Sequence, residues 1–221
     1  MESKEFETLG IILAIKNHGD NDGVIKVLTQ KGLFFLFARG IQKPNSKNKL
    51  NIPLLGLVNL EIIKPKIMGK IATLKRATLI SFFPINPLLQ DIFKNVNHFL
   101  NFMNNNNLDK LIETYKLFLN NVEEKPNHSY SLILLSFLEQ LGHRPNFKSC
   151  VECINVDNII DFEFYKGGFI CNLHSSSKKE INFLKSVFWL NKDFNFYKNN
   201  IDEKQAIKIN LMIVEFLSSL I

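Results

Sequence analysis

The first eighty residues alternate between short apolar runs and turn-forming stretches. Branched and aromatic residues fill five runs, and stretches rich in Gly, Pro, Asn, Asp and Lys separate them. Short runs of this kind at close spacing predict strands and are typical of a small barrel. We expect five strands, over residues 9–16, 23–29, 32–40, 54–64 and 71–80.

Five such strands fit the oligonucleotide-binding barrel, or OB fold, which is a partly open Greek key. The link between the third and fourth strands spans residues 41–53 and contains Pro44 and Pro53. Because two prolines interrupt helical hydrogen bonding, we expect no regular helix in that link.

From Pro87 onward the apolar period changes to that of helices. Helices are expected over residues 88–103, 108–122, 128–142, 177–190 and 201–220, and the third is apolar on nearly every side and therefore buried. The fold class is thus α+β, with a five-stranded OB-fold barrel over residues 1–80 and a helical domain over 81–221.

The charge is distributed unevenly between these two parts. Residues 1–80 hold thirteen Lys and Arg against six Asp and Glu, whereas residues 81–221 hold fourteen against fifteen. All of the positive surplus therefore lies in the N-terminal part, which favours a polyanionic partner. The alternative is a solvated surface produced by a lysine-rich codon bias.

The apolar runs are too short for a membrane span, and the charged start MESKEFETLG does not resemble a signal peptide. We therefore expect no membrane partner and a cytoplasmic protein. Three cysteines are too few for a disulfide framework, and in a reducing compartment clustered thiols more often bind metal.

All three cysteines lie close together in the C-terminal part. Cys150 and Cys153 form a C-x₂-C pair, Cys171 and His174 form a C-x₂-H pair, and seventeen residues separate the two pairs. The segment between the pairs can fold back as a hairpin, with Gly167 and Gly168 at its turn. Three thiolates and an imidazole suit tetrahedral zinc with no open position, so we expect a structural zinc module at about 147–175.

Two alternatives to this ligand set remain at this point. His143 could replace His174 as the fourth ligand, and the thiols could be buried without metal. No catalytic set accompanies the cysteines, because no histidine precedes a glutamate by two residues as in zinc deaminases, and neither G-x-S-x-G nor a P-loop occurs. We therefore expect a binding protein rather than an enzyme.

Two stretches of the chain resemble the RecO family of bacterial recombination mediators. The first is LGIILAIKNHGDNDGVIKVLTQKGLFFLFARGIQKPNSK, and the second is LGHRPNFKSCVEC followed by GGFIC. The resemblance covers nearly the whole chain and keeps the order and spacing of the family pattern. It departs from that pattern at Asp20, where Glu is more usual, and at His174, where the zinc-binding members usually have a fourth cysteine.

The resemblance implies an N-terminal OB fold, a helical C-terminal domain and, in many members, a zinc module. It also implies binding of single- and double-stranded DNA, annealing of complementary strands, and a role in DNA repair and recombination in the bacterial nucleoid. The partners it implies are RecR, single-strand binding protein and, indirectly, RecA, which the family helps to load onto coated strands.

The residues expected to contact DNA are the basic ones in and after the second and third strands. They are Lys26, Lys31, Arg39, Lys43, Lys47, Lys49, Lys66, Lys70, Lys75 and Arg76. Phe34, Phe35 and Phe37 are candidates for base stacking, with the barrel core as the alternative. An RNA-binding OB-fold protein and a scaffold that binds only protein remain as other functions.

Overall fold

The computed structural model describes residues 5–65, 67, 69–103 and 107–221. The chain divides into two compact units, residues 1–120 and 121–221, called here the N-terminal and C-terminal units. The barrel strands end at residue 81, close to the predicted domain boundary, but two helices beyond it belong to the N-terminal unit. The boundary at residue 80 therefore stays a prediction.

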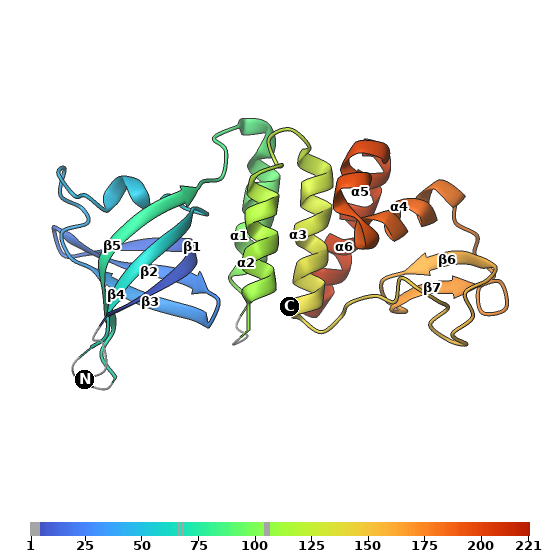
Figure 1. Ribbon diagram of the computed structural model, residues 1–221, viewed down its shortest axis with the longest axis horizontal. Helices are drawn as coiled ribbons and strands as arrows, with labels where there is room; N and C mark the ends of the chain where they lie inside the picture. Colours follow the sequence, from blue (N-terminus) through green and yellow to red (C-terminus); the bar gives the residue numbers. More distant parts are fainter. Residues whose placement is uncertain (1–4, 66, 68, 104–106) are drawn as a thin grey trace. The chain divides into compact units, whose positions relative to one another are not determined.

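The five predicted strands form a closed barrel in the N-terminal unit (Figure 1). They are β1 (Glu5–His18), β2 (Asp22–Thr29), β3 (Gly32–Ala38), β4 (Leu57–Ile63) and β5 (Ala72–Ser81). Around the barrel the order is β1-β2-β3-β5-β4, and β4 pairs with β1 to close it. Only β3 and β5 run parallel among these pairs. This is the strand order of an OB fold, as the sequence predicts.

The inside of the barrel is apolar because alternate residues of each strand point inward. Ile12, Ile25, Leu36, Leu60 and Leu74 are among the buried residues of this core. A register shift between Ile12 and Ala14 lets the long strand β1 bend and pair with β2 at one end and β4 at the other. The link after β3 holds only a three-residue 3-10 helix, Lys49–Asn51, in agreement with its two prolines.

Two helices complete the N-terminal unit, α1 (Gln90–Leu100) and α2 (Asp109–Leu119), and a 3-10 turn at Pro87–Leu89 precedes them. Buried Tyr115 on α2 donates a hydrogen bond from its hydroxyl to the carbonyl oxygen of Leu55, at 2.7 Å. The N–H of Leu108 donates to the carbonyl of Gln30, at 3.0 Å. These bonds join the helix pair to the barrel.

The C-terminal unit contains α3 (Pro126–Gln140), the hairpin β6 (Ile159–Glu163) and β7 (Gly168–Cys171), and then α4 (Ile181–Lys192), α5 (Phe194–Asn200) and α6 (Glu203–Leu220). The predicted burial of α3 is confirmed, since ten of its residues are buried. It packs against α5 and α6, and Ser131 Oγ lies 2.6 Å from Asn210 Oδ1 and 2.9 Å from the Tyr197 hydroxyl.

The predicted helix at 201–220 is confirmed, with Asp202 capping its first turn. The predicted segment 177–190 becomes helical only from Ile181. The sequence reasoning missed α5, although Asp193 accepts a hydrogen bond from the N–H of Phe196 as an ordinary N-cap does. Among the described residues, the structure contains no helix with the length and apolar character that a bilayer crossing requires.

Candidate metal centre and nucleic-acid interface

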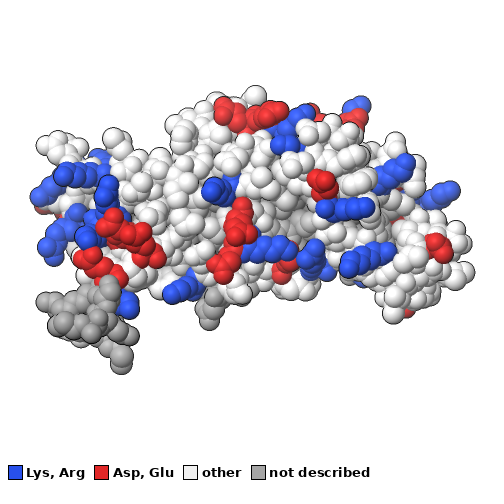
Figure 2. All heavy atoms as spheres, viewed as in Figure 1, with Lys and Arg blue, Asp and Glu red and all other residues white. Residues whose placement is uncertain are grey.

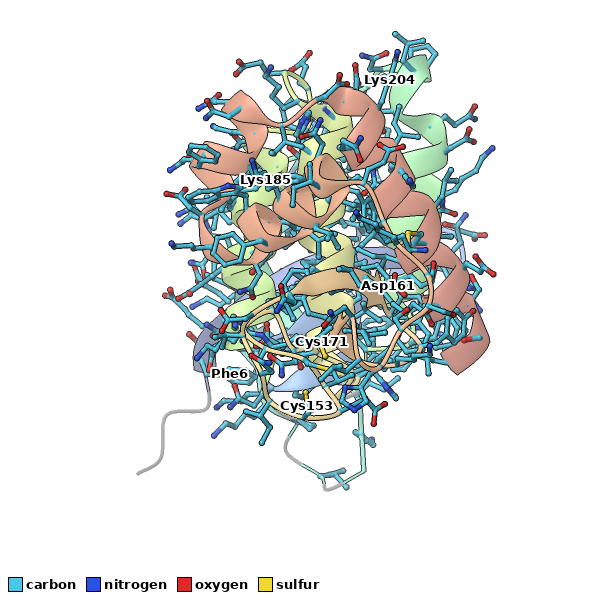
Figure 3. All side chains as sticks on the ribbon, turned by 90° about the vertical axis from the view of Figure 1, so that its right-hand side faces the viewer. Phe6, Cys153, Asp161, Cys171, Lys185 and Lys204 are labelled. Atoms are coloured by element: carbon cyan, nitrogen blue, oxygen red, sulfur yellow. The ribbon has the colours of Figure 1, made fainter. Side chains whose placement is uncertain are left out.

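The four predicted ligand residues come together at one end of the β6–β7 hairpin. The sulfurs of Cys150, Cys153 and Cys171 and a ring nitrogen of His174 all lie within 4.8 Å of one another. Figure 3 shows Cys153 close to Cys171, the last residue of β7. His143, the alternative fourth ligand, instead places its ring edge-on against Phe216, with centroids 5.7 Å apart.

The distances within this cluster fit a tetrahedral metal ion. Zinc–sulfur bonds of about 2.3 Å place two sulfurs roughly 3.8 Å apart, and a nitrogen ligand roughly 3.6 Å from a sulfur. In the structure the Sγ atoms of Cys153 and Cys171 are 3.7 Å apart. Nδ1 of His174 lies 3.3 Å from Cys171 Sγ and 3.7 Å from Cys150 Sγ. The donor set and its spacing therefore suit zinc.

Hydrogen bonding within the cluster favours the ionised form of two of the three sulfurs, those of Cys150 and Cys171, whereas the pKa of Cys153 is raised. Burial opposes ionisation of Cys150, but backbone N–H groups, that of Cys171 foremost, outweigh it and lower its pKa to about 6. A hydrogen bond with His174 lowers the pKa of Cys171 and raises that of the imidazole. A metal cation in place of the proton shared by Cys171 and His174 would therefore bind two sulfurs, those of Cys150 and Cys171, that already favour the thiolate form.

The backbone around the cluster holds its two halves in register. Asn146, just before the first cysteine pair, accepts a bond from the N–H of Phe169 and donates its own N–H to Gly167. Gly168 has a φ of 142°, and a Cβ at that position would collide with the backbone of Asn146. Glycine is therefore required where the hairpin approaches the segment that carries Cys150.

A buried carboxylate steadies the segment that follows His174. Asp161 on β6 is fully buried, and Ser175 donates a hydrogen bond to its Oδ2 at 2.6 Å. The N–H of Phe162 donates to Oδ1 at 2.8 Å, and Lys179 Nζ lies 3.9 Å away. Because a buried charge needs such partners, this contact restricts where Ser175, and with it His174, can lie.

The predicted DNA-contacting residues are mostly exposed. The exposed ones are Lys31, Arg39, Lys43, Lys47, Lys49, Lys70, Lys75 and Arg76. Lys26 is half-buried, and its Nζ donates to Asn101 Oδ1 at 2.6 Å, so it is held against the end of α1. Lys66 lies outside the described residues. Lys31 lies in the β2–β3 turn and Lys70 in the β4–β5 link, so neither belongs to the loop between β3 and β4.

The loop between β3 and β4 brings three of these residues together. Its middle is fixed to β5 by Asn48, which accepts a hydrogen bond from the N–H of Ala77 at 3.0 Å. As a result Lys47 on the loop and Lys75 and Arg76 on β5 line one groove of about 780 Å³. Figure 2 shows Lys and Arg side chains gathered over the barrel, with Asp and Glu side chains beside them.

Part of this positive charge is already neutralised. Lys75 Nζ lies 2.6 Å from a carboxylate oxygen of Glu5 and 3.7 Å from one of Glu61, and the bond to Glu5 raises the pKa of the lysine. Arg76 lies 3.9 Å from Glu61. The groove is therefore mixed in charge, whereas no acidic residue occurs between Arg39 and Leu60 along the loop.

The outer face of β1, β2 and β3 carries residues that the sequence reasoning did not combine. Lys26 on β2 pairs with Ala14 on β1 and with Phe35 on β3, so these three side chains are cross-strand neighbours. Two residues along, Val24 pairs in the same way with Lys16 and Phe37. Phe35 is 51% exposed.

Two further residues extend this face. His18 places its ring edge-on against Phe37, 5.7 Å between centroids, and Arg39 follows directly after β3. We call Lys16, His18, Phe35, Phe37 and Arg39 the aromatic face. The strand alternation that places Phe35 and Phe37 outward could have revealed it.

The loop connects this face with the groove. The N–H of Gln42 donates to the carbonyl of Asn21 in the β1–β2 turn, at 2.9 Å, and the Gln42 amide donates to Asn17 at 2.7 Å. The loop thus begins beside the aromatic face and reaches β5 at Asn48, with Lys43 and Lys47 between these attachments.

The chain matches two family descriptions in the order expected. Residues 1–83 match "Recombination protein O N terminal", and residues 98–186 match "Recombination protein O C terminal". It is also similar to the DNA repair protein RecO of Mycoplasma capricolum subsp. capricolum, with 31% identity over 159 residues. That alignment covers 65% of this chain and 61% of the relative, so the chain spans less than two thirds of the relative's length. On these matches and the OB-fold barrel, the chain belongs to the RecO family of recombination and DNA repair proteins.

Proposed function

We propose that this protein binds single- and double-stranded DNA without sequence preference and anneals complementary strands. The observation that carries the proposal is the aromatic face, where an exposed phenylalanine lies among basic side chains on the strands that OB folds use for oligonucleotides. From Arg39 the basic loop leads onward through Lys43 to Lys47.

Such a surface binds mainly through phosphates. Each lysine or arginine that neutralises a phosphate releases a condensed counterion, so affinity falls as salt rises. Phosphate contacts carry no sequence information, and stacking on Phe35 accepts any base because every base has a π-face. The expected binding is therefore salt-sensitive and indifferent to sequence.

Annealing follows from the same contacts. Two single strands repel each other through their phosphates, and a basic surface that binds both lowers this repulsion. Base edges that are not held by the protein remain able to pair. This process requires neither a chemical step nor a nucleotide cofactor, and we propose that the protein is not an enzyme.

The Cys₃His cluster would hold zinc in a structural role. Four protein ligands leave no open position for water, so the ion would stabilise the hairpin rather than react. Cys150 and Cys153 come from one loop, and Cys171 and His174 from the end of β7 and the turn after it. Zinc would therefore join the two ends of the 147–175 module.

Family membership supports a set of protein partners. We propose that this chain acts in the bacterial nucleoid with RecR, and that together they help to load RecA onto strands coated by single-strand binding protein.

The test is strand annealing with complementary oligonucleotides, naked or coated with single-strand binding protein, with and without RecR. The variant Lys43→Glu/Lys47→Glu/Lys49→Glu should lose annealing. Its matched control, Lys94→Glu/Lys110→Glu/Lys116→Glu, makes the same change in net charge on α1 and α2 and should retain it. Equal loss in both variants would show that only total charge matters, and would overturn the proposed surface.

A competition experiment separates the other functional classes. Single-stranded DNA and RNA of the same sequence compete for the wild-type protein. A strong preference for RNA together with failure to bind RecR would favour an RNA-binding protein. Absence of salt-sensitive binding to either nucleic acid would favour a scaffold that binds only protein.

A further inference from the structure

The C-terminal unit has a pocket of its own, separate from the metal cluster. The helices α4 and α5 and the start of α6 enclose about 700 Å³. Its lining includes Trp189 and Phe196 together with the polar side chains of Asn182, Lys185 and Gln205. This volume is within the range of small-ligand sites and would hold one or two nucleotide bases.

Aromatic rings form one wall of this pocket. Trp189 on α4 stacks on Phe196 of α5, with centroids 3.9 Å apart and an interplanar angle of 28°. Phe196 is 37% exposed, so part of its ring is open to a further planar group. The ammonium group of Lys192 lies 5.1 Å from the ring centroids of both Trp189 and Phe188. The wall thus offers a π-stack with a cation beside it.

Polar groups complete the pocket. Asn182 and Asn200 contribute amides to the lining, and Lys185 contributes an exposed ammonium group. Figure 3 shows Lys185 on α4, separate from the labelled cysteines. The side-chain oxygen of Gln205 is buried without a hydrogen-bond partner among the described residues, so it is an acceptor that a ligand donor could satisfy.

One acidic residue, Asp202, also lines the pocket. Its carboxylate accepts the N–H of Lys204 at 2.8 Å and caps the first turn of α6. The cap gives this charge a structural function. Lys185 in the lining, and Lys192 over the Trp189 and Phe188 rings just outside it, are the cations that could meet an anion.

We propose that this pocket binds bases of single-stranded nucleic acid. A base would extend the Trp189–Phe196 stack, its edge would meet the Asn and Gln amides, and the flanking phosphates would lie near Lys185 and Lys192. Flat rings, amides and cations together match a nucleotide better than a purely acidic or purely apolar ligand. The inference rests on the proposed function in one respect: a second strand site would let one chain hold both strands that it anneals.

Trp189 makes the test direct because it is the only tryptophan in the chain. Hexathymidylate is titrated into the full, zinc-loaded protein while tryptophan fluorescence is recorded, and binding of a longer labelled strand is followed separately by anisotropy. We expect a saturable decrease in fluorescence. With two phosphates neutralised, the affinity should fall about sevenfold when salt rises fourfold.

Three variants locate the signal. Lys185→Glu/Lys192→Glu should abolish the fluorescence change. Lys166→Glu/Lys204→Glu makes an equal charge change in the same unit, at lysines that are neither in the pocket lining nor over the Trp189 and Phe188 rings, and should keep it. The loop variant Lys43→Glu/Lys47→Glu/Lys49→Glu should also keep it, since its changes lie on the barrel.

The outcomes separate the two proposals. Anisotropy that reports binding without any fluorescence change would overturn the pocket and leave the barrel function standing. Loss of the fluorescence change in the loop variant, or a change caused by an acidic peptide but not by hexathymidylate, would also overturn the pocket. Absence of any nucleic-acid binding by either method would overturn both. A fluorescence change that survives in the loop variant, with annealing lost, supports the pocket.

Discussion

The Cys₃His cluster and the basic surface of the barrel differ in how their members are held. The four ligand residues lie within one segment of the C-terminal unit, and their donor atoms converge within 4.8 Å. The basic residues come from β2, β5 and three different connections between strands, and some are already paired with Glu5 or Glu61. Short, regular spacing therefore defines the first site closely, whereas a count of lysines does not show which of them face a partner.

The largest expected effect comes from removing a ligand of the Cys₃His cluster. Cys171→Ser should remove zinc and lower the stability of the C-terminal unit by about 4 kcal/mol, because loss of a structural metal is among the most destabilising changes. Metal content by elemental analysis and thermal unfolding would measure this.

Two further variants make that prediction sharper. His174→Cys should keep one zinc per chain, since four thiolates also close a tetrahedral site. Leu173→Ser, between two ligands but 76% exposed, should change neither zinc content nor stability. Full zinc content in Cys171→Ser would contradict the assigned ligand set.

A smaller loss should follow from Gly168→Ala. The new Cβ would collide with the backbone of Asn146, and together with the backbone strain this should cost about 3 kcal/mol. Gly167→Ala is the matched control: its φ of 85° makes alanine strained, but nothing lies near the added carbon, so about 1–2 kcal/mol is expected. Equal unfolding free energies for the two variants would argue against the close approach.

On the barrel side, Phe35→Ala should weaken binding of single-stranded DNA by about 1–3 kcal/mol, the contribution of one stacked base. Fluorescence anisotropy with a short labelled strand would measure it. Leu50→Ala removes another exposed apolar side chain of the same unit and should leave the affinity unchanged. If both variants bind like the wild type, the aromatic face does not stack bases.

The smallest expected effect separates Lys75, which has carboxylate partners, from Lys47 on the loop. Lys47→Gln should reduce the slope of log affinity against log salt by about 0.7 for single strands, the value for one phosphate contact. Lys75→Gln should reduce it less, because Glu5 and Glu61 already neutralise this lysine. A larger reduction for Lys75 would mean that DNA displaces those carboxylates.

The elements that the sequence predicts well are those whose signal is local. Strand alternation and helical period each show within a short segment of sequence. They identify all five barrel strands and five of the six α-helices found among the described residues. The C-x₂-C and C-x₂-H pairs are equally local. The helix α5 has only seven residues, too few for a clear period, and so it was missed.

What the sequence could not predict depends on contacts between distant segments. The bond between Lys26 and Asn101 joins residues 75 positions apart, and nothing in either local pattern indicates it. The pairing of Lys75 with Glu5 is of the same kind, at 70 positions. The prediction that Lys26 contacts DNA now competes with this structural contact.

The bond between Tyr115 and Leu55 bears on how the protein can be cut into pieces for study. Ile11, Leu13 and Leu28 are buried although they do not belong to the barrel's inner cluster, and α2 packs against β1. A fragment truncated after residue 80 would expose these side chains to water, and the Leu55 carbonyl would lose its hydrogen bond from Tyr115. An expression fragment meant to carry the OB fold alone should therefore run to about residue 120, where the first compact unit ends.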